Sequence, residues 1–249
     1  MKLTINKDYS GYSAWIKMLP QDFNHGELVH DGRNVIRKFN LGDAVFIVKR
    51  YRVPNPVQRL SYSIFRPSKA RRAYEYAFEF LKRGIMTPDP VAYIEMFHGG
   101  FLAYSYFVST ECVWPEVRSV LPKEGEFSTG VADAFAAYLA GMQRAGVFHG
   151  DLNLGNFMFN KDKEGKYLFC AVDINRSRFV DMDLRNTAKS LCRLSHRRDM
   201  FEYIVRRCAE ARGMDPELLM EESINCLDSF EKKNALKRKL KSFFKRSKR

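Results

Sequence analysis

The chain has 249 residues, of which 45% are hydrophobic and 29% are charged, so it suits one two-lobed domain or two small ones. Its five cysteines are odd in number and form no C-x-x-C pair, which argues against a disulfide framework and a zinc site and fits a reducing compartment. The first residues are too polar for a signal peptide, and no apolar run has the length of a membrane span. We therefore expect the chain to remain in the cytoplasm.

The net charge of +13 is unevenly distributed along the sequence. Residues 231–249 contain ten basic residues and one acid, whereas the preceding 230 residues contain 32 basic and 28 acidic residues. The last segment is therefore the basic element of the chain, and such a segment attracts nucleic acid or anionic lipid.

The N-terminal part of the sequence predicts strands with one helix. The first thirty residues are expected to be irregular, with short extended pieces around residues 14–18. Two strand-like runs follow at 34–39 and 44–51, separated by turn-forming residues. Pro54 and Pro56 interrupt the chain, and the apolar spacing over 68–83 predicts a helix that ends at a glycine.

The remaining sequence changes from a hairpin to mostly helices. A second hairpin is predicted over 91–109, followed by a loop-rich crossing over 110–125 and a helix over 127–145. A short strand, a third hairpin and a run of helices from about 183 complete the pattern. This order predicts an α+β molecule with two lobes, a small strand-rich N-lobe and a mostly helical C-lobe. The expected divisions are an N-lobe over 1–111, a C-lobe over 112–231 and a basic tail over 232–249.

The segment from His149 to Asn156 reads H-G-D-L-N-L-G-N and is the most informative feature of the chain. Its Asp151 and Asn156 have the spacing by which kinases hold one carboxylate near the attacking hydroxyl and one amide near a metal. We expect Asp151 to accept or orient the acceptor proton, Asn156 to bind magnesium and Asn153 to touch the acceptor or the transferring phosphoryl group. His149 is expected to be structural. The alternative reading of the segment is an Asx-rich turn.

Three further residues occur in the order that a kinase requires. Lys49 ends an apolar strand and could orient nucleotide phosphates, with Glu75 of the following helix as its ion-pair partner. The alternative for Glu75 is a surface pair with Arg71 at i−4, and Glu79 competes with Glu75 for the pairing role. Asp173 follows a buried-strand pattern, where a carboxylate needs a partner that magnesium would supply.

The glycine-rich phosphate cradle is poorly represented in this sequence. No G-x-G-x-x-G occurs, and the segment around Gly32 and Arg33 has a single glycine. Backbone amides of a tight turn could still hold phosphate there, with help from Arg33.

These motifs together resemble the bacterial lipopolysaccharide kinase family, which is related to protein kinases, RIO kinases and aminoglycoside phosphotransferases. The resemblance spans roughly residues 25–195. It rests on G-R-N from Gly32, V-K-R-Y around Lys49, the helix around Glu75, G-I-M-T-P-D-P from Gly84, the Asp151 segment and D-I-N-R-S-R-F from Asp173. It implies a protein-kinase-like fold, ATP and Mg²⁺ as cofactors and, as acceptor, a Kdo or heptose hydroxyl on a lipid-anchored substrate at the inner face of the cytoplasmic membrane.

Two departures from protein kinases point towards a sugar or small-molecule acceptor. Ile174 and Asn175 replace the last two residues of D-F-G, and no A-P-E segment follows. Gly150 replaces the arginine of H-R-D. The alternatives that remain open are a RIO-like protein kinase, an aminoglycoside-type kinase, and a nucleotide-binding pseudokinase that acts as a scaffold.

The basic tail has the pattern of an amphipathic helix. Leu236, Leu240, Phe243 and Phe244 share one helical face, and basic residues occupy the remainder. We expect this helix to lie on an anionic membrane surface and to make the protein peripheral there. Nucleic-acid contacts, or a solvated tail with no partner, are the less favoured alternatives, and the oligomeric state is not readable.

Overall fold

The computed structural model describes residues 1–53 and 66–246, with side chains as far as residue 239 in the last helix. The described chain divides into two units. The first contains Met1–Val113 and Cys170–Arg176, and the second contains Trp114–Phe169 and Ser177–Arg249. The break expected at Pro54 and Pro56 lies outside the described residues.

The first unit is built on a six-stranded antiparallel sheet. Its strands are β1 (Lys2–Ile5), β2 (Glu27–Asp31), β3 (Val35–Leu41), β4 (Ala44–Tyr51), β5 (Pro90–His98) and β6 (Phe101–Thr110). They lie in the order β1-β5-β6-β4-β3-β2. The turns that the sequence predicts are present, because Gly42 between β3 and β4, and Gly99 and Gly100 between β5 and β6, all adopt positive φ.

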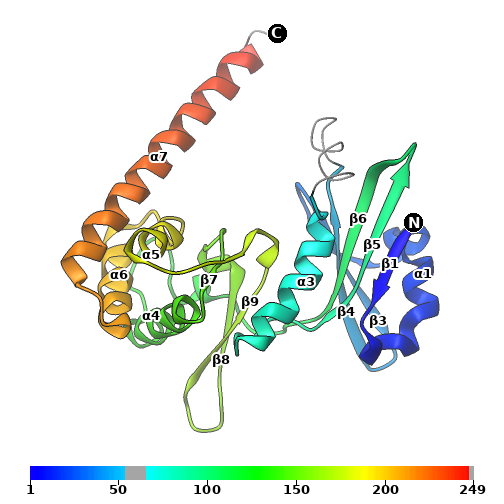
Figure 1. The fold of residues 1–249 in the computed structure, drawn as a ribbon, viewed down its shortest axis with the longest axis horizontal. Helices are drawn as coiled ribbons and strands as arrows, with labels where there is room; N and C mark the ends of the chain where they lie inside the picture. Colours follow the sequence, from blue (N-terminus) through cyan, green and yellow to red (C-terminus); the bar gives the residue numbers. More distant parts are fainter. Residues whose placement is uncertain (54–65, 247–249) are drawn as a thin grey trace. The chain divides into compact units, whose positions relative to one another are not determined.

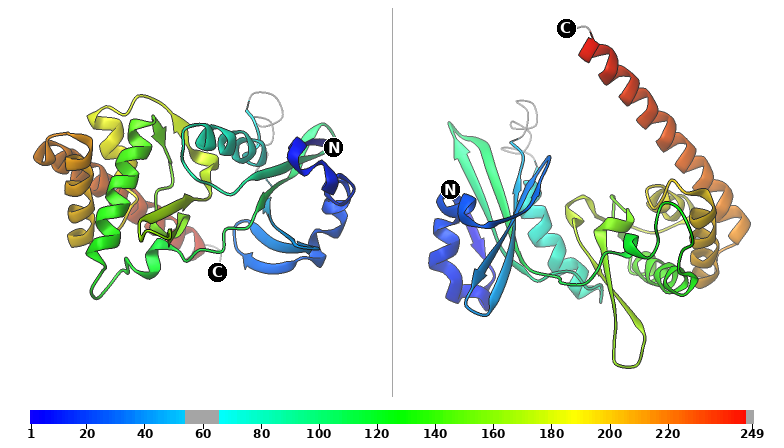
Figure 2. Two further views of the ribbon diagram at one scale, coloured as in Figure 1. Left: turned by 90° about the horizontal axis from the view of Figure 1, so that it is seen from below. Right: turned by 180° about the vertical axis from the view of Figure 1, so that it is seen from behind.

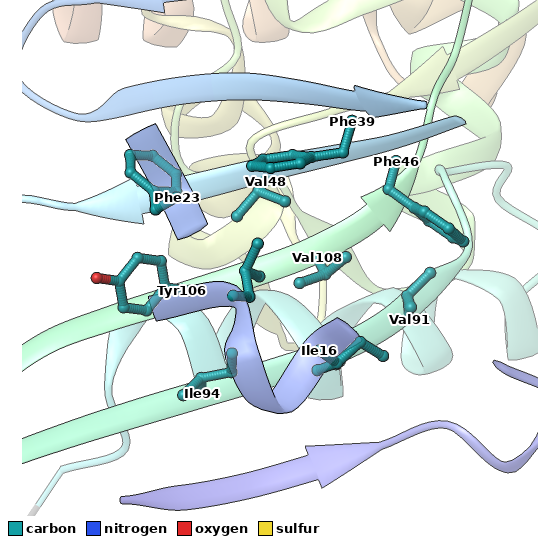
Figure 3. Packing of buried hydrophobic residues seen from close by; sticks show 11 residues of the cluster. Ile16, Phe23, Phe39, Phe46, Val48, Val91, Ile94, Tyr106 and Val108 are labelled. Atoms are coloured by element: carbon teal, nitrogen blue, oxygen red, sulfur yellow. The ribbon is translucent and has the colours of Figure 1, made fainter. Parts of the chain in front are cut away.

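Helices cover both faces of this sheet (Figure 1). Helix α1 (Ser13–Asp22) and the short η2 (Phe23–His25) pack Ile16, Leu19 and Phe23 onto the face that carries Phe46 and Val48, as Figure 3 shows for most of this cluster. Helix α3 (Lys69–Lys82) covers the opposite face, where Tyr74 contacts the ring of Tyr93. Since side chains alternate along a strand, Lys49 lies on the α3 face, next to Val48 on the other.

The expectation of irregular structure over the first thirty residues is wrong. Strand β1 pairs with β5, the short η1 (Lys7–Tyr12) follows, and α1 occupies the residues where an extended piece was predicted. Pro20, a residue that helix interiors disfavour, lies within α1. The spacing of Ile16, Leu19 and Phe23 places them together on the sheet, and their burial stabilises the helix.

The second unit is mostly helical. Its helices are η3 (Val117–Ser119), α4 (Thr129–Arg144), η4 (Leu154–Asn156), α5 (Leu184–Leu191), α6 (Arg198–Arg212) and α7 (Pro216–Arg246). Two small antiparallel pairs, β7 (Val147–Phe148) with β10 (Arg178–Phe179) and β8 (Phe157–Lys161) with β9 (Tyr167–Ala171), flank the Asp151 segment. Helix α4 packs against α6, and α7 packs against both α5 and α6.

The last helix continues well beyond its packed part (Figure 2). Leu219, Ser223 and Leu227 are buried, whereas residues 235–239 are exposed and Leu236 is 59% exposed. The expected tail over 232–249 is thus continuous with α7 as far as Arg246. The side chains of Leu240, Phe243 and Phe244 lie outside the described residues, so the amphipathic face stays a prediction.

The chain crosses between the two units more often than the expected divisions imply. Cys170–Arg176, which falls within the expected C-lobe, belongs to the first unit. The Ala171 amide donates to the Met86 carbonyl over 2.9 Å, and the Thr87 hydroxyl donates to the Ala171 carbonyl over 2.7 Å. These bonds attach the η5 turn (Ile174–Arg176) and the residues before it to the sheet unit.

Candidate active site

The first unit brings Lys49 and Asp173 together from distant parts of the sequence. The Nζ of Lys49 lies 2.7 Å from Oδ1 of Asp173, and the two side chains are 14% and 29% exposed. Lys49 is fixed by its strand, where it pairs with Ile36 on β3 and Phe107 on β6. Its ammonium also lies 5.5 Å from the centroid of the Tyr51 ring. A rigid strand therefore presents a partly buried cation to the carboxylate predicted to bind metal.

Asp173 is held by its own turn as well as by Lys49. It has a φ of 55°, and among the described residues it alone combines positive φ with a side chain. Such a conformation persists where surrounding contacts impose it, and it clusters at functional sites. The Asn175 amide donates to Oδ1 of Asp173. Burial, then the Asp173 charge, raises the pKa of Tyr51, which is also hydrogen-bonded to Asn175.

A group of cations lies near this pair. Lys69, at the start of α3, has its pKa lowered to about 8 by burial and then by Arg33, Arg176 and Arg72, whereas Asp173 opposes the shift. Arg72 is buried in α3, and Arg33 and Arg176 are exposed. A half-buried lysine among three guanidinium groups is an arrangement that a bound anion would stabilise.

The ion pair predicted between Lys49 and Glu75 is wrong, because the structure pairs each residue differently. Glu75 accepts from Arg71 over 2.7 Å, with both side chains more than 40% exposed, while Lys49 binds Asp173. Glu79 pairs with Arg83 at i+4. Both helix acids thus take the nearest basic partner on their own surface, as the alternative reading of Glu75 proposed.

Gly32 and Arg33 lie in the turn between β2 and β3. The Gly32 amide donates to the Asn34 carbonyl over 3.3 Å, and the nearest atom to a Cβ built at Gly32 would be in the His30 ring, at 2.5 Å. A side chain can turn aside, so the turn does not strictly require glycine. Arg33 is therefore the residue of this turn that could help to bind phosphate, because its charge acts on nearby Lys69.

In the second unit, the Asp151 segment forms a tightly bonded loop. Gly150 has a φ of 76°, and His149 is 1% exposed, with its ring 5.0 Å from that of Phe157. The side-chain nitrogen Nδ2 of Asn156 donates to the backbone carbonyl of Asp151 over 2.8 Å. Because its nitrogen is the donor in this bond, its amide oxygen is the atom suited to meet a cation.

Asn153 is engaged within the same loop. Its Oδ1 accepts from the Gly155 amide over 3.0 Å, and its Nδ2 lies 3.4 Å from the Asp151 carbonyl. These contacts assign it a role in shaping the loop. A direct contact with the acceptor stays a prediction.

The carboxylate of Asp151 has a partner that the sequence did not reveal. The Nη1 of Arg193, just after α5, lies 2.8 Å from Oδ1 of Asp151. Arg193 was missed because it belongs to no local motif near residue 151. Lys69 was missed because it belongs to no motif, whereas Asn175 and Arg176 lie in the D-I-N-R motif that begins at Asp173 but were given no role.

A family comparison decides the class of the protein. The model of the lipopolysaccharide kinase (Kdo/WaaP) family matches residues 57–210. The chain belongs to this family. The matched residues include Asp151, Asn153, Asn156, Asp173 and Arg193, whereas Lys49 and the turn at Gly32 precede them. Membership makes the protein a kinase of the lipopolysaccharide class and implies the use of ATP.

A solved structure agrees with this assignment at the level of fold. The structure titled "WaaP in complex with acyl carrier protein" matches with a TM-score of 0.59 and 17% identity, over 94% of this chain and 98% of that one. The kinase-like α+β fold expected from the sequence is thereby confirmed. A comparison of this chain with curated proteins found no match.

Proposed function

We propose that the protein transfers the γ-phosphate of ATP to a sugar hydroxyl, of Kdo or heptose, in the inner core of lipopolysaccharide or a related envelope glycolipid. The observation that carries the proposal is the ion pair between Lys49 and Asp173, 2.7 Å apart and partly buried. A strand lysine and a carboxylate held in this way match the pair that orients phosphates and binds metal in kinases.

Each predicted site residue would have its own role in phosphoryl transfer. Lys49 would orient the phosphates, with Lys69 and Arg33 compensating their charge. Asp151 would orient the acceptor hydroxyl and receive its proton. Little covalent chemistry falls to the protein in this reaction, so positioning and charge compensation dominate.

The donor atoms present fit a magnesium ion. The Asp173 carboxylate and the Asn156 amide oxygen are hard oxygen ligands, the type that Mg²⁺ prefers. When bound, the ion would neutralise charge on the phosphate oxygens.

None of the helices that the structure describes has an apolar stretch of the length needed to span a bilayer. We propose that the basic outer part of α7 attaches the protein to the anionic inner face of the cytoplasmic membrane.

The test of the proposed activity compares Asp151→Ala with wild type. We expect phosphorylation of a lipid A–Kdo acceptor to fall by about 10²- to 10⁴-fold, because general-base positioning contributes that much. ATP binding should be retained. Asp162→Ala, in the exposed turn after β8, is the matched control and should keep wild-type activity.

Acceptor class is tested by a panel with labelled ATP. Inner-core glycolipids should be phosphorylated, and small aminoglycosides and proteins should not. Mass spectrometry of core oligosaccharide from cells with and without the protein should show loss of one phosphate. An unchanged core, or turnover with Asp151→Ala, would contradict the proposal. A pull-down with acyl carrier protein tests whether the partner in the WaaP structure also binds here.

A further inference from the structure

Arg193 joins the Asp151 carboxylate to the last helix. Its Nη1 lies 2.8 Å from Oδ1 of Asp151, and its guanidinium carbon lies 4.9 Å from the centroid of the Phe230 ring in α7. The side chain of Arg193 is 36% exposed and that of Asp151 is 23% exposed. One guanidinium thus contacts both a loop carboxylate and a helix aromatic, which is a use suited to arginine, whose planar group donates and stacks at once.

The aromatic partner is itself held firmly in place. The His196 ring stacks parallel to the Phe230 ring, with the two centroids 6.2 Å apart and the planes at 9°. The same histidine pairs with Glu231 over 2.8 Å, and Arg198 pairs with both Asp228 and Glu231. The segment between α5 and α6 is therefore fastened to one turn of α7 around Phe230.

Arg193 and the hydrogen bonds within the loop act on different groups of Asp151. Asn156 and the Asn153 backbone amide both donate to the Asp151 carbonyl, so they fix the main chain there. Arg193 acts on the carboxylate itself. An acceptor hydroxyl must be held within hydrogen-bond reach for transfer, so the rotamer of this carboxylate matters. A carboxylate has several acceptor sites, and a bond to Oδ1 is compatible with binding a hydroxyl.

Charge gives a second reason for an arginine at this position. Phosphates that approach an uncompensated carboxylate are repelled by it. A guanidinium at 2.8 Å offsets that charge without removing the carboxylate. The pair thus suits a site that must hold an anionic group and a nucleophile together.

We propose that Arg193 is a positioning residue for Asp151 and that Phe230 of α7 sets the place of its guanidinium. The proposal rests on the proposed function, in which Asp151 orients the acceptor hydroxyl. It makes the packed part of α7 a support for the catalytic loop. The helix with the basic tail would then serve catalysis through its inner half.

The test compares steady-state kinetics of four variants with purified glycolipid acceptor. Arg193→Met should lower kcat by about 10- to 100-fold, as expected for a displaced catalytic group, with the KM values for ATP and acceptor changed less than about 3-fold. Arg193→Lys should recover part of the loss, since it restores charge but not the stacked plane. Phe230→Leu should lower kcat less than Arg193→Met does.

Arg206→Met is the control, because Arg206 of α6 joins α7 by an ion pair with Glu217 over 2.8 Å, at the start of α7 and not in the turn around Phe230. It should keep kcat near wild type, because Phe230 and its contacts stay in place. Wild-type kcat in Arg193→Met, or an equal loss in Arg206→Met, would overturn the proposal. Should Arg193→Met fail to fold, Arg193→Lys and Phe230→Leu decide the question by the same split between kcat and KM.

Asp151→Asn, assayed in parallel, separates the two levels of inference. Full activity of Asp151→Asn would count against the proposed function itself. An inactive Asp151→Asn beside a fully active Arg193→Met would overturn only the positioning role of Arg193.

Discussion

At the residue scale, the ion pair of Lys49 with Asp173 supports a direct prediction. Replacing Lys49 by methionine removes the cation expected to orient the phosphates and leaves Asp173 without that partner. Loss of one charge-stabilising donor at a reacting centre typically lowers kcat by about 10²- to 10³-fold, and we expect a fall of that size. Steady-state kinetics with saturating ATP measures it.

The sheet offers a matched control for this variant. Lys38 of β3 pairs with Glu111 over 2.9 Å, and its side chain is partly buried like that of Lys49, at 27% exposure. Lys38→Met should keep kcat near wild type with a comparable change in stability. An equal loss of activity in both variants would show that the Lys49 effect is only structural.

The lowered pKa of Lys69 predicts that the binding of anions near it depends on pH. The pKa of Lys69 is lowered to about 8 by burial and by Arg33, Arg176 and Arg72, and only Asp173 acts in the opposite sense. Below this pH the folded protein carries the charge, and above it the charge is lost. A phosphate bound nearby favours the charged form, so the affinity for ATP should fall as pH rises from 7.5 to 9.5, by roughly the few-fold expected for one cation.

Lys69→Arg tests the origin of this dependence. Arginine stays charged throughout that range, so titration calorimetry should find an affinity that changes less with pH than in wild type. Parallel pH profiles in the two proteins would show that Lys69 does not contact the bound anion. Lys69→Met should bind ATP more weakly at pH 7.5 and approach wild type at pH 9.5.

At the scale of elements, the sequence predicts helices and strands correctly where local signals determine them. Helix α3 runs from Lys69 to Lys82 because Ser68 accepts from the Arg71 amide and Gly84 adopts positive φ, and both signals were visible in the sequence. Strands β3 and β4 likewise follow their apolar runs and their turn. Helix α1 was missed because its stability comes from packing on the sheet, which outweighs Pro20.

The same distinction applies to the candidate site. Lys49, Asp151, Asn156 and Asp173 could be proposed from the sequence because each lies at a fixed spacing from a strand or loop signal. The partner of Glu75 was misjudged, since a helix acid with a basic residue four positions before it needs no distant one. Arg193 was invisible, because its contact with Asp151 depends on how α5, α6 and α7 pack together.

At the scale of the whole molecule, the chain is electrically divided. Of the net charge of +13, residues 232–249 supply ten positive charges, so their removal would leave +3. The outer part of α7 is exposed over residues 235–239, the last ones whose side chains are described. It can therefore be removed after Glu231 while Phe230 and its contacts remain.

We expect the chain that ends at Glu231 to lose binding to vesicles with anionic lipid and to keep its kcat on detergent-dispersed acceptor. Basic residues near such a surface contribute about 1 kcal/mol each, and raising the salt concentration should weaken wild-type binding in the same direction. In the intact chain, changing Lys237, Arg238 and Lys239 together to glutamine should give a partial loss. The equivalent triple change at the exposed Lys17, Lys82 and Lys163 is the control and should bind as wild type does. Equal vesicle binding with and without the tail would contradict the membrane role, and a loss of RNA binding alone would favour the nucleic-acid alternative, since only a lipid surface needs the apolar face predicted for this helix.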